Sequence, residues 1–129
     1  MTHKRHYSLE EATEALPLVV ELVERMRRAR SRLTDAEARA ALSDATPTNG
    51  GGNPGRTVSE GFLELRETLI GLQAMDVVLR DLETGLIDFP ALRDGREVYL
   101  CWQVDETEVG HWHAAETGYP SRLPLDPWI

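Results

Sequence analysis

The sequence has little cysteine and no long hydrophobic run. Its 129 residues contain one cysteine, which excludes an internal disulfide framework. No apolar stretch approaches the roughly 20 residues of a membrane-spanning helix. The basic N-terminus is not followed by the apolar segment of a secretory signal. These absences predict a cytoplasmic protein with no membrane partner.

Acidic residues outnumber basic ones, with 22 Asp and Glu against 14 Lys and Arg. The net charge is −8, and the excess of Asp and Glu falls in the second half of the chain. Because an acidic domain repels the phosphate backbone, we expect no nucleic-acid partner. The spacing of Glu21 and Glu24 to arginines four residues later indicates a solvated helix face, although this run could dock an acidic partner. The arginine run comprises Arg25, Arg27, Arg28, Arg30 and Arg32.

The first long pattern of the chain is helical. Ser8 and Glu11 form a capping box, and apolar residues then recur at alternating steps of three and four. We therefore predict a helix over residues 8–43. Pro17 lies inside this pattern, where its ring and its missing N–H normally disrupt a helix, so we expect a kink or a restart there.

A connection rich in glycine, proline and asparagine follows at residues 44–58, and we predict a flexible loop there. A second apolar stripe predicts a helix over residues 59–84, with Gly85 as its C-terminal stop. Two long helices joined by one loop indicate an antiparallel hairpin. Their apolar stripes are wider than a single seam requires, so the additional apolar residues need cover from the C-terminal segment or from a second subunit. We predict a homodimer with a four-helix core. The additional residues are Leu18, Val20, Leu22, Leu63, Ile70, Val77 and Val78.

The hydrophobic period changes to two after the second helix, which is typical of strands. Asp94-Gly95 is a strong signal for a two-residue hairpin turn. We predict a small three-stranded antiparallel β-meander over residues 85–114 and an irregular tail over 115–129. The whole chain, residues 1–129, is then one α+β domain in which a long antiparallel α-helical hairpin precedes the meander.

Residues that can do chemistry are concentrated in the meander. A two-residue Asp94-Gly95 turn places Asp88 opposite Cys101. If the next turn has three residues, Cys101 faces His113. If it has four, Cys101 faces Trp112, and His113 points to the other face of the sheet. A difference of one residue in the length of this turn therefore decides whether Cys101 and His113 lie in one reactive row or Cys101 only packs against Trp112.

A row of Asp88, Cys101 and His113 would resemble a zinc site with an open position, because all three side chains are metal ligands. His111 shares a strand face with His113 and is a further candidate ligand. The same row could instead activate the cysteine as a nucleophile. Each residue also has a structural interpretation, as a small buried hydrophobe, a strand-end carboxylate or a half-buried histidine.

Several complete motifs are missing. The chain has no C-x-x-C and no H-E-x-x-H pattern, so neither a metal site nor a catalytic cysteine has a specific signature. The segment GGGNPGRT lacks the following lysine and the preceding strand of a phosphate-binding loop. We therefore expect no nucleotide-dependent chemistry.

Motifs with a joint spacing run along nearly the whole chain. They are YSLEEATEALP, VVLRDLETGLIDFPAL, REVYLCWQVDE, the pair Trp112-His113, and then Gly118 and Arg122. With these motifs the chain resembles the bacterial family catalogued as domain of unknown function 2203. The family pattern has a glycine before Glu106 and before Arg122, where this chain has Asp105 and Ser121. The resemblance supports the architecture and the choice of site residues, with Glu106 and Arg122 as accessories, but supplies no reaction.

These observations predict a non-catalytic binding or assembly protein. Its helices would self-associate, and the polar cluster on its meander would bind a divalent transition metal such as zinc or a small ligand. The alternative is a small enzyme, either a metal-dependent hydrolase or one with a cysteine nucleophile. An adaptor that docks an acidic partner on the arginine run is a third hypothesis.

Overall fold

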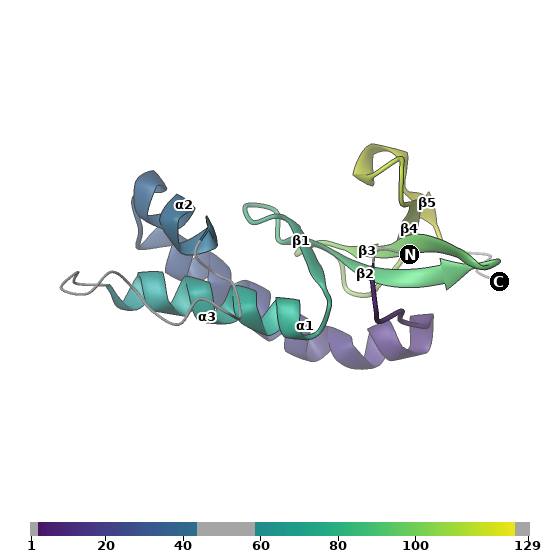
Figure 1. Cartoon of the computed structure of the whole chain (residues 1–129), viewed down its shortest axis with the longest axis horizontal. Helices are drawn as coiled ribbons and strands as arrows, with labels where there is room; N and C mark the ends of the chain where they lie inside the picture. Colours follow the sequence, from purple (N-terminus) through teal and green to yellow (C-terminus); the bar gives the residue numbers. More distant parts are fainter. Residues whose placement is uncertain (1–2, 44–58, 126–129) are drawn as a thin grey trace.

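The computed structural model describes residues 3–43 and 59–125, and these form three α-helices and a five-stranded antiparallel sheet (Figure 1). The helices are α1 (Leu9–Ser31), α2 (Asp35–Ser43) and α3 (Glu60–Ala74). The strands are β1 (Val78–Asp81), β2 (Leu86–Arg93), β3 (Arg96–Trp102), β4 (His111–Ala114) and β5 (Leu123–Pro124), adjacent in that order. The α+β class is confirmed, but the predicted hairpin with a three-stranded meander is not the architecture observed.

The segment predicted as one helix over residues 8–43 forms two helices. Ser8 caps α1 as predicted, and the Glu11 carboxylate returns a bond to the Ser8 amide. The helix continues through Pro17, so the predicted restart is wrong, and it ends at Ser31. Packing of the apolar face of α1 therefore outweighs the hydrogen bond lost at the proline.

A second capping box separates α2 from α1. The Glu37 amide donates to the Thr34 hydroxyl over 3.1 Å, and the Thr34 amide donates to the Glu37 carboxylate over 3.0 Å. The sequence T-D-A-E carries this signal, which marks a new helix start inside a continuous apolar pattern. The loop predicted over residues 44–58 lies outside the described residues.

The second predicted helix begins as expected but ends at Ala74 rather than at residue 84. Asp76 then adopts a left-handed backbone conformation with φ of 58°, which turns the chain into β1. The sequence of β1 begins with the second of two valines, and β-branched residues favour strands. The prediction failed here because the apolar spacing of so short a segment fits both a helix and a strand.

The sheet has one apolar face and one polar face. The apolar face joins the buried residues of the helices in one core, and its members are Ile87, Phe89, Ala91, Val98, Leu100 and Trp102. Burial of each large side chain contributes about 1.5–3 kcal/mol. The alternate residues, including Asp88 and Cys101, lie on the face turned away from the helices. In Figure 1 the C-terminal segment with β5 rises on that side of the sheet.

The first hairpin turn is confirmed. Arg93 pairs with Arg96, and Asp94 and Gly95 both have positive φ values, 54° and 76°. This turn places Asp88 opposite Cys101, as predicted. Its register follows from local turn chemistry, because a two-residue turn of this type fixes the pairing of both strands.

The second connection is longer than either predicted turn. It spans residues 103–110 and pairs Cys101 with His111 and Tyr99 with His113. Two hydrogen bonds to Glu106 fix the start of this connection. The Gln103 amide donates to the Glu106 carboxylate over 3.0 Å, and the Trp102 indole donates to the Glu106 carbonyl over 2.9 Å. Both predicted registers, Cys101 opposite His113 or opposite Trp112, are therefore wrong.

The tail predicted as irregular over residues 115–129 contains ordered structure. A short 3₁₀ turn, η1 (Tyr119–Ser121), precedes β5, which pairs with β4 through Leu123 and Pro124. The Leu125 amide also donates to the Gly110 carbonyl over 3.0 Å. Residues 126–129 lie outside the described part of the chain.

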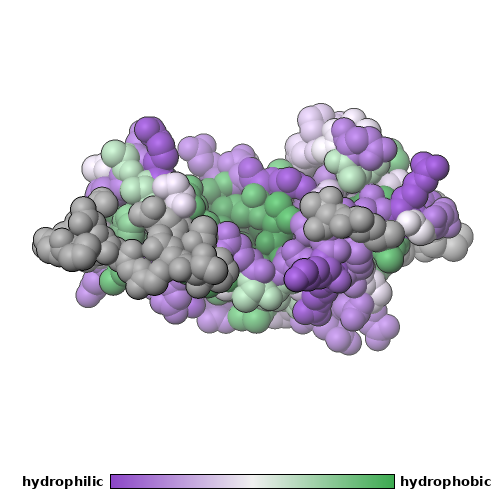
Figure 2. All heavy atoms as spheres, viewed as in Figure 1, coloured by the Kyte–Doolittle hydropathy of each residue, from purple (hydrophilic) through white to green (hydrophobic). Residues whose placement is uncertain are grey.

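Apolar atoms gather in the middle of the surface between α2 and β1 (Figure 2). A cavity of about 440 Å³ lies in this region, with Leu42, Leu69, Val77 and Leu79 in its lining. Within the described residues, no helix combines the length and the hydrophobicity that a bilayer crossing requires.

Candidate metal centre

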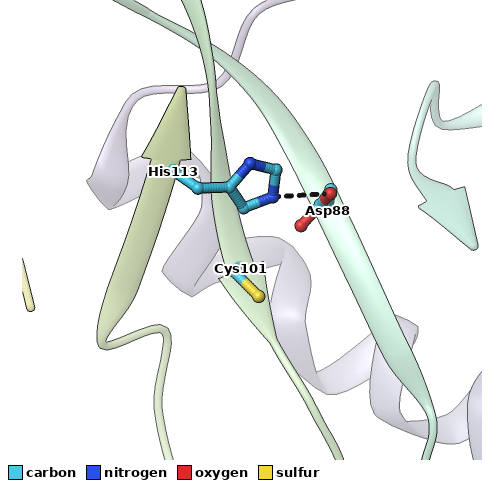
Figure 3. A group of neighbouring side chains, drawn as sticks. All are labelled: Asp88, Cys101 and His113. Atoms are coloured by element: carbon cyan, nitrogen blue, oxygen red, sulfur yellow. Dashed lines mark hydrogen bonds and ion pairs between the residues drawn. The ribbon is translucent and has the colours of Figure 1, made fainter. Parts of the chain in front are cut away.

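Asp88, Cys101 and His113 meet on the polar face of the sheet, one each from β2, β3 and β4 (Figure 3). One potential ligand atom of each lies within 4.8 Å of the other two, and all three residues are buried. His113 pairs with Tyr99 and reaches the group diagonally, because residues two apart on a strand share a face. The predicted group therefore forms, but through a register that was not predicted.

The histidine is held at both ring nitrogens. Nε2 of His113 lies 2.9 Å from Oδ2 of Asp88, and Nδ1 lies 2.9 Å from the Ala114 carbonyl oxygen. Because a carbonyl oxygen only accepts, Nδ1 donates to it. Burial disfavours the imidazolium, but the bonds to Asp88 and to the Ala114 carbonyl outweigh burial, so the pKa of His113 is raised. The proton on Nε2 thus holds the histidine and the aspartate together.

The Asp88 carboxylate is buried and only partly satisfied. Its Oδ2 accepts bonds from His113 and from Nε of Arg80, the latter over 2.8 Å. Its Oδ1 has no hydrogen-bond partner among the described residues, and water does not readily reach it because the side chain is only 1% exposed. Figure 3 shows this second oxygen turned into the space beside Cys101. A buried oxygen without a partner is costly, so the site favours one more cation or donor at this point.

Cys101 is fully buried beside this carboxylate. Burial and the charge of Asp88 raise the pKa of its thiol to about 12, against the lowering effect of Arg122, whose Nη1 lies 3.8 Å from Sγ. A cysteine nucleophile needs a depressed pKa and some exposure. The geometry therefore does not favour the cysteine-nucleophile alternative in the metal-free protein.

Glu106 and Arg122, the two accessory candidates, form a two-bond ion pair. Nη1 and Nη2 of Arg122 lie 3.1 and 3.0 Å from the two carboxylate oxygens of Glu106. The guanidinium also lies 4.7 Å from the centre of the Tyr119 ring. Arg122 contacts Cys101 directly, whereas Glu106 contacts Arg122 and holds its guanidinium in place. This pair ties the 103–110 connection to the segment that leads into β5.

His111, the further candidate ligand, is not brought into the group. It pairs with Cys101 across the strands, but its Nδ1 lies 3.1 Å from Oε2 of Glu106. This nitrogen is buried, and the contact lacks hydrogen-bond geometry. Among the described residues, only Asp88, Cys101 and His113 form a group that could hold a metal ion.

Arg80 and Tyr99 complete the site and were missed in the sequence. The Arg80 guanidinium lies 4.8 Å from the centre of the Tyr99 ring, and that ring lies 5.3 Å from the His113 ring. The predicted helix over residues 59–84 includes Arg80, so the sequence did not place Arg80 on the sheet beside Asp88. The turn residues Thr84-Gly85, which follow a short valine-rich stretch, are the signal that could have indicated a hairpin here.

The N-terminal histidines, His3 and His6, also lie on this face. His3 Nε2 lies 2.9 Å from the Tyr99 hydroxyl, and its Nδ1 lies 2.9 Å from Oδ1 of Asp76. His6 Nε2 lies 2.8 Å from a Glu97 carboxylate oxygen. These contacts fix the segment before α1 beside the cluster.

An open pocket of about 370 Å³ leads to the cluster. Arg80, Asp88 and His113 contribute to its lining, together with residues 115–119. Asp88 and His113 lie in the wall of this pocket, although each is almost fully buried, whereas Cys101 is fully buried and is not part of the lining. Such a volume is within the range of small-ligand sites.

Comparison of the chain with curated proteins and with solved structures finds no match. One family model matches residues 5–125, a range that contains the cluster, the Glu106–Arg122 pair and Arg80. The resemblance expected from the spacing of the motifs is thereby confirmed. The chain belongs to the family described as Uncharacterized conserved protein (DUF2203).

Proposed function

We propose that the protein binds one divalent transition metal ion, such as zinc, through Asp88, Cys101 and His113. The observation that carries the proposal is the approach of three buried ligand-type atoms to within 4.8 Å of one another. Carboxylate, thiolate and imidazole ligands lie about 2.0–2.3 Å from zinc, so a tetrahedral site would hold them roughly 3.3–3.8 Å apart. Small side-chain shifts on a rigid sheet would complete such a site.

The residues around the cluster match the supports that metal ligands usually have. The Nδ1–H of His113 donates to the Ala114 carbonyl, which leaves Nε2 as the ligand atom once its proton is lost. Arg80 donates to Asp88, and Arg122 approaches Cys101. Outer hydrogen bonds of this kind orient ligands and stabilise their charged forms. They support a metal site more strongly than the three ligands alone.

Metal binding would compete with protons at this site. In the metal-free protein, a proton on Nε2 of His113 links it to Asp88, and the high pKa of Cys101 keeps its thiol protonated. A bound ion would displace both protons, because it requires a neutral imidazole lone pair and a thiolate. Affinity should therefore rise with pH.

The same site is compatible with two kinds of function, metal binding and metal-dependent hydrolysis. In a binding protein, the ion would join β2, β3 and β4 and stabilise the polar face of the sheet. In a metal-dependent hydrolase, an open position on the ion would activate water. The pocket beside Asp88 and His113 favours an open position, but Glu116, the one carboxylate of its lining besides Asp88, is exposed. We therefore propose binding as the primary function.

Metal analysis of the purified protein tests the proposal. Protein stripped with a chelator is reloaded with zinc, and bound metal is measured by mass spectrometry for the parent and for Cys101→Ala, His113→Ala and His111→Ala. We expect one equivalent in the parent and in His111→Ala, which removes a neighbouring histidine from the same strand. We expect a loss of affinity of at least about 100-fold in the other two.

Two results would reject the metal site. One is a folded parent protein that binds no stoichiometric zinc at neutral pH. The other is equal zinc binding by the parent and by a Cys101→Ala, His113→Ala double variant. Circular dichroism of each variant separates loss of ligands from loss of the fold.

We also propose the predicted homodimer. Leu18 on α1 and Leu63 on α3 are 49% and 51% exposed, whereas Leu22 and Val77, which were expected to need cover, are buried within the chain. Light scattering would decide between one and two chains. A monomeric mass that persists at high protein concentration would remove the dimer.

A further inference from the structure

We infer that an ion at this site binds a small oxyanion, a carboxylate or a phosphate group, and that Arg80 pairs with the same anion. The inference rests on the proposed metal site and adds a ligand class to it. It is carried by the position of Arg80 in the pocket and by the charges around the cluster.

The pocket gives a route from solvent to the cluster. Arg80, Asp88 and His113 line the same cavity of about 370 Å³, while Cys101 belongs to the cluster but not to this lining. A ligand that enters this cavity therefore meets Asp88, His113 and the Arg80 side chain together. An ion held by the three ligands would present its remaining position to this molecule.

The charges at the site point to an anion. A divalent ion would be neutralised by the carboxylate of Asp88 and the thiolate of Cys101. Arg122 already has a counter-ion, because it makes two bonds to Glu106. Among the described residues, the carboxylate paired with Arg80 is Asp88 alone. Once Asp88 shares its charge with the ion, the charge of Arg80 is no longer fully balanced, and an anion in the pocket would balance it.

Arg80 has the geometry for this role. Its Nε is bonded to Asp88, and its guanidinium lies 4.8 Å from the centre of the Tyr99 ring, which restrains its plane. The Arg80 side chain is 41% exposed, so part of its guanidinium remains open to solvent. A planar guanidinium matches the paired oxygens of carboxylates and phosphates better than an ammonium group does.

One acidic residue opposes this preference. Glu116 lines the pocket, but it is exposed, and solvent and salt weaken its repulsion of an anion. The Asp88 oxygen without a partner supports the metal ion on which the inference rests, not the anion itself. It is buried beside the pocket, where a metal ion would satisfy it and bring the anion within reach of Arg80.

Cobalt substitution allows binding of the ion and of the anion to be measured separately. The stripped protein is loaded with Co²⁺, and its visible spectrum is followed during titration with acetate, with acetamide as a neutral control of the same shape. Inorganic phosphate is titrated in a second series. We expect saturable spectral changes with acetate or phosphate and none with acetamide. The oxyanion that saturates at the lower concentration identifies the class.

Variants test the part played by Arg80. The Co²⁺ affinity of Arg80→Gln and Arg80→Lys is determined first, and anions are then titrated at saturating Co²⁺. We expect Arg80→Gln to weaken anion binding roughly 10-fold or more, because it removes a charge-assisted bond, and Arg80→Lys to weaken it less. Arg96→Gln, at an exposed arginine outside this pocket, serves as the matched control.

The outcomes separate the two proposals. Absence of Co²⁺ binding in the folded parent overturns the metal site itself. Stoichiometric Co²⁺ with no response to either anion overturns only the inference drawn here. An equal response to acetamide, or equal anion binding by the parent and Arg80→Gln, would also overturn it.

Discussion

Nε2 of His113 lies 2.9 Å from Oδ2 of Asp88, and this contact joins β4 to β2 across the intervening strand. The side chains are only 3% and 1% exposed. A hydrogen bond between these two atoms requires a proton, because a deprotonated carboxylate oxygen and a bare ring nitrogen both only accept. The contact therefore determines how the site responds to pH, to substitution and to metal.

The stability supplied by His113 should depend on pH. Its pKa is raised in the folded protein, so the folded state binds a proton at His113 more tightly than the unfolded state does. This contribution is complete below the unfolded value of about 6.5 and is lost as pH rises through the raised folded value. In the presence of EDTA, urea unfolding of the parent and of His113→Gln should differ most at pH 5.5 and less at pH 8.5. His111→Gln is the control, and a difference that is flat or grows with pH would contradict the assignment.

Removal of the Asp88 charge should strongly destabilise the fold. In Asp88→Asn the buried His113 and the partly exposed Arg80 lose their anionic partner, and breaking a buried ion pair such as His113–Asp88 typically costs about 3–5 kcal/mol. Asp94→Asn is a matched control, because Asp94 occupies an exposed turn with φ of 54°, which asparagine tolerates well. Its free energy of unfolding should change by less than about 0.5 kcal/mol. Equal effects of the two substitutions in denaturant unfolding would show that Asp88 does not anchor the site.

The sequence was sufficient where local chemistry decides the structure. The Asp94-Gly95 turn determined the pairing of β2 with β3, so Asp88 could be placed opposite Cys101 before the structure was known. The connection after β3 was different. Its length depends on Glu106, whose carboxylate is bound by Arg122 from 16 residues farther along the chain. Local periodicity carries no information about such a contact.

The helix-to-strand change after α3 was the second failure, and it concealed part of the site. Arg80 reaches Asp88 only because Val78–Asp81 forms a strand beside β2. Asp76 makes the required turn in a left-handed conformation, which is uncommon for residues other than glycine. Its contacts with His3 and the Arg5 amide, on a distant segment, help to hold it there.

Cys101 should react very slowly in the folded, metal-free protein. With a pKa of about 12, its thiolate fraction at pH 7.5 is on the order of 10³-fold lower than that of an ordinary cysteine with a pKa of about 8.5. Burial of the sulfur should slow the reaction further. Alkylation by iodoacetamide, followed by intact-mass spectrometry, should therefore be slow in EDTA and fast in denaturant. Rapid modification of the folded protein would return the cysteine nucleophile to consideration.

The Glu106–Arg122 pair should stabilise the connection between β3 and β4. Glu106→Gln removes the charge that binds Arg122 and weakens the acceptor of the Gln103 amide. We expect a loss of about 1–3 kcal/mol, with faster hydrogen exchange across residues 103–110. Glu108→Gln, at an exposed position in the same connection, should have little effect on either measurement. Equal exchange in the two variants would show that the ion pair does not hold this segment.

Two glycines with similar backbone angles allow steric crowding to be separated from backbone strain. Gly85 and Gly95 have φ of 63° and 76°, so alanine at either position costs about 1–2 kcal/mol in conformational strain. A Cβ at Gly85 would also overlap Cγ2 of Val104 and lie 2.9 Å from Cγ1 of Val23, whereas a Cβ at Gly95 would meet no atom within 4 Å.

Gly85→Ala should therefore destabilise the protein by about 1–3 kcal/mol more than Gly95→Ala, because overpacking adds to the strain. Thermal and urea unfolding of both variants measures the difference. In the Gly85→Ala background, Val104→Ala should cost less than it does in the parent, because it relieves the overlap. Equal costs for the two glycine substitutions would mean that Val104 and Val23 move aside freely, and that the turn between β1 and β2 is not packed tightly against the core.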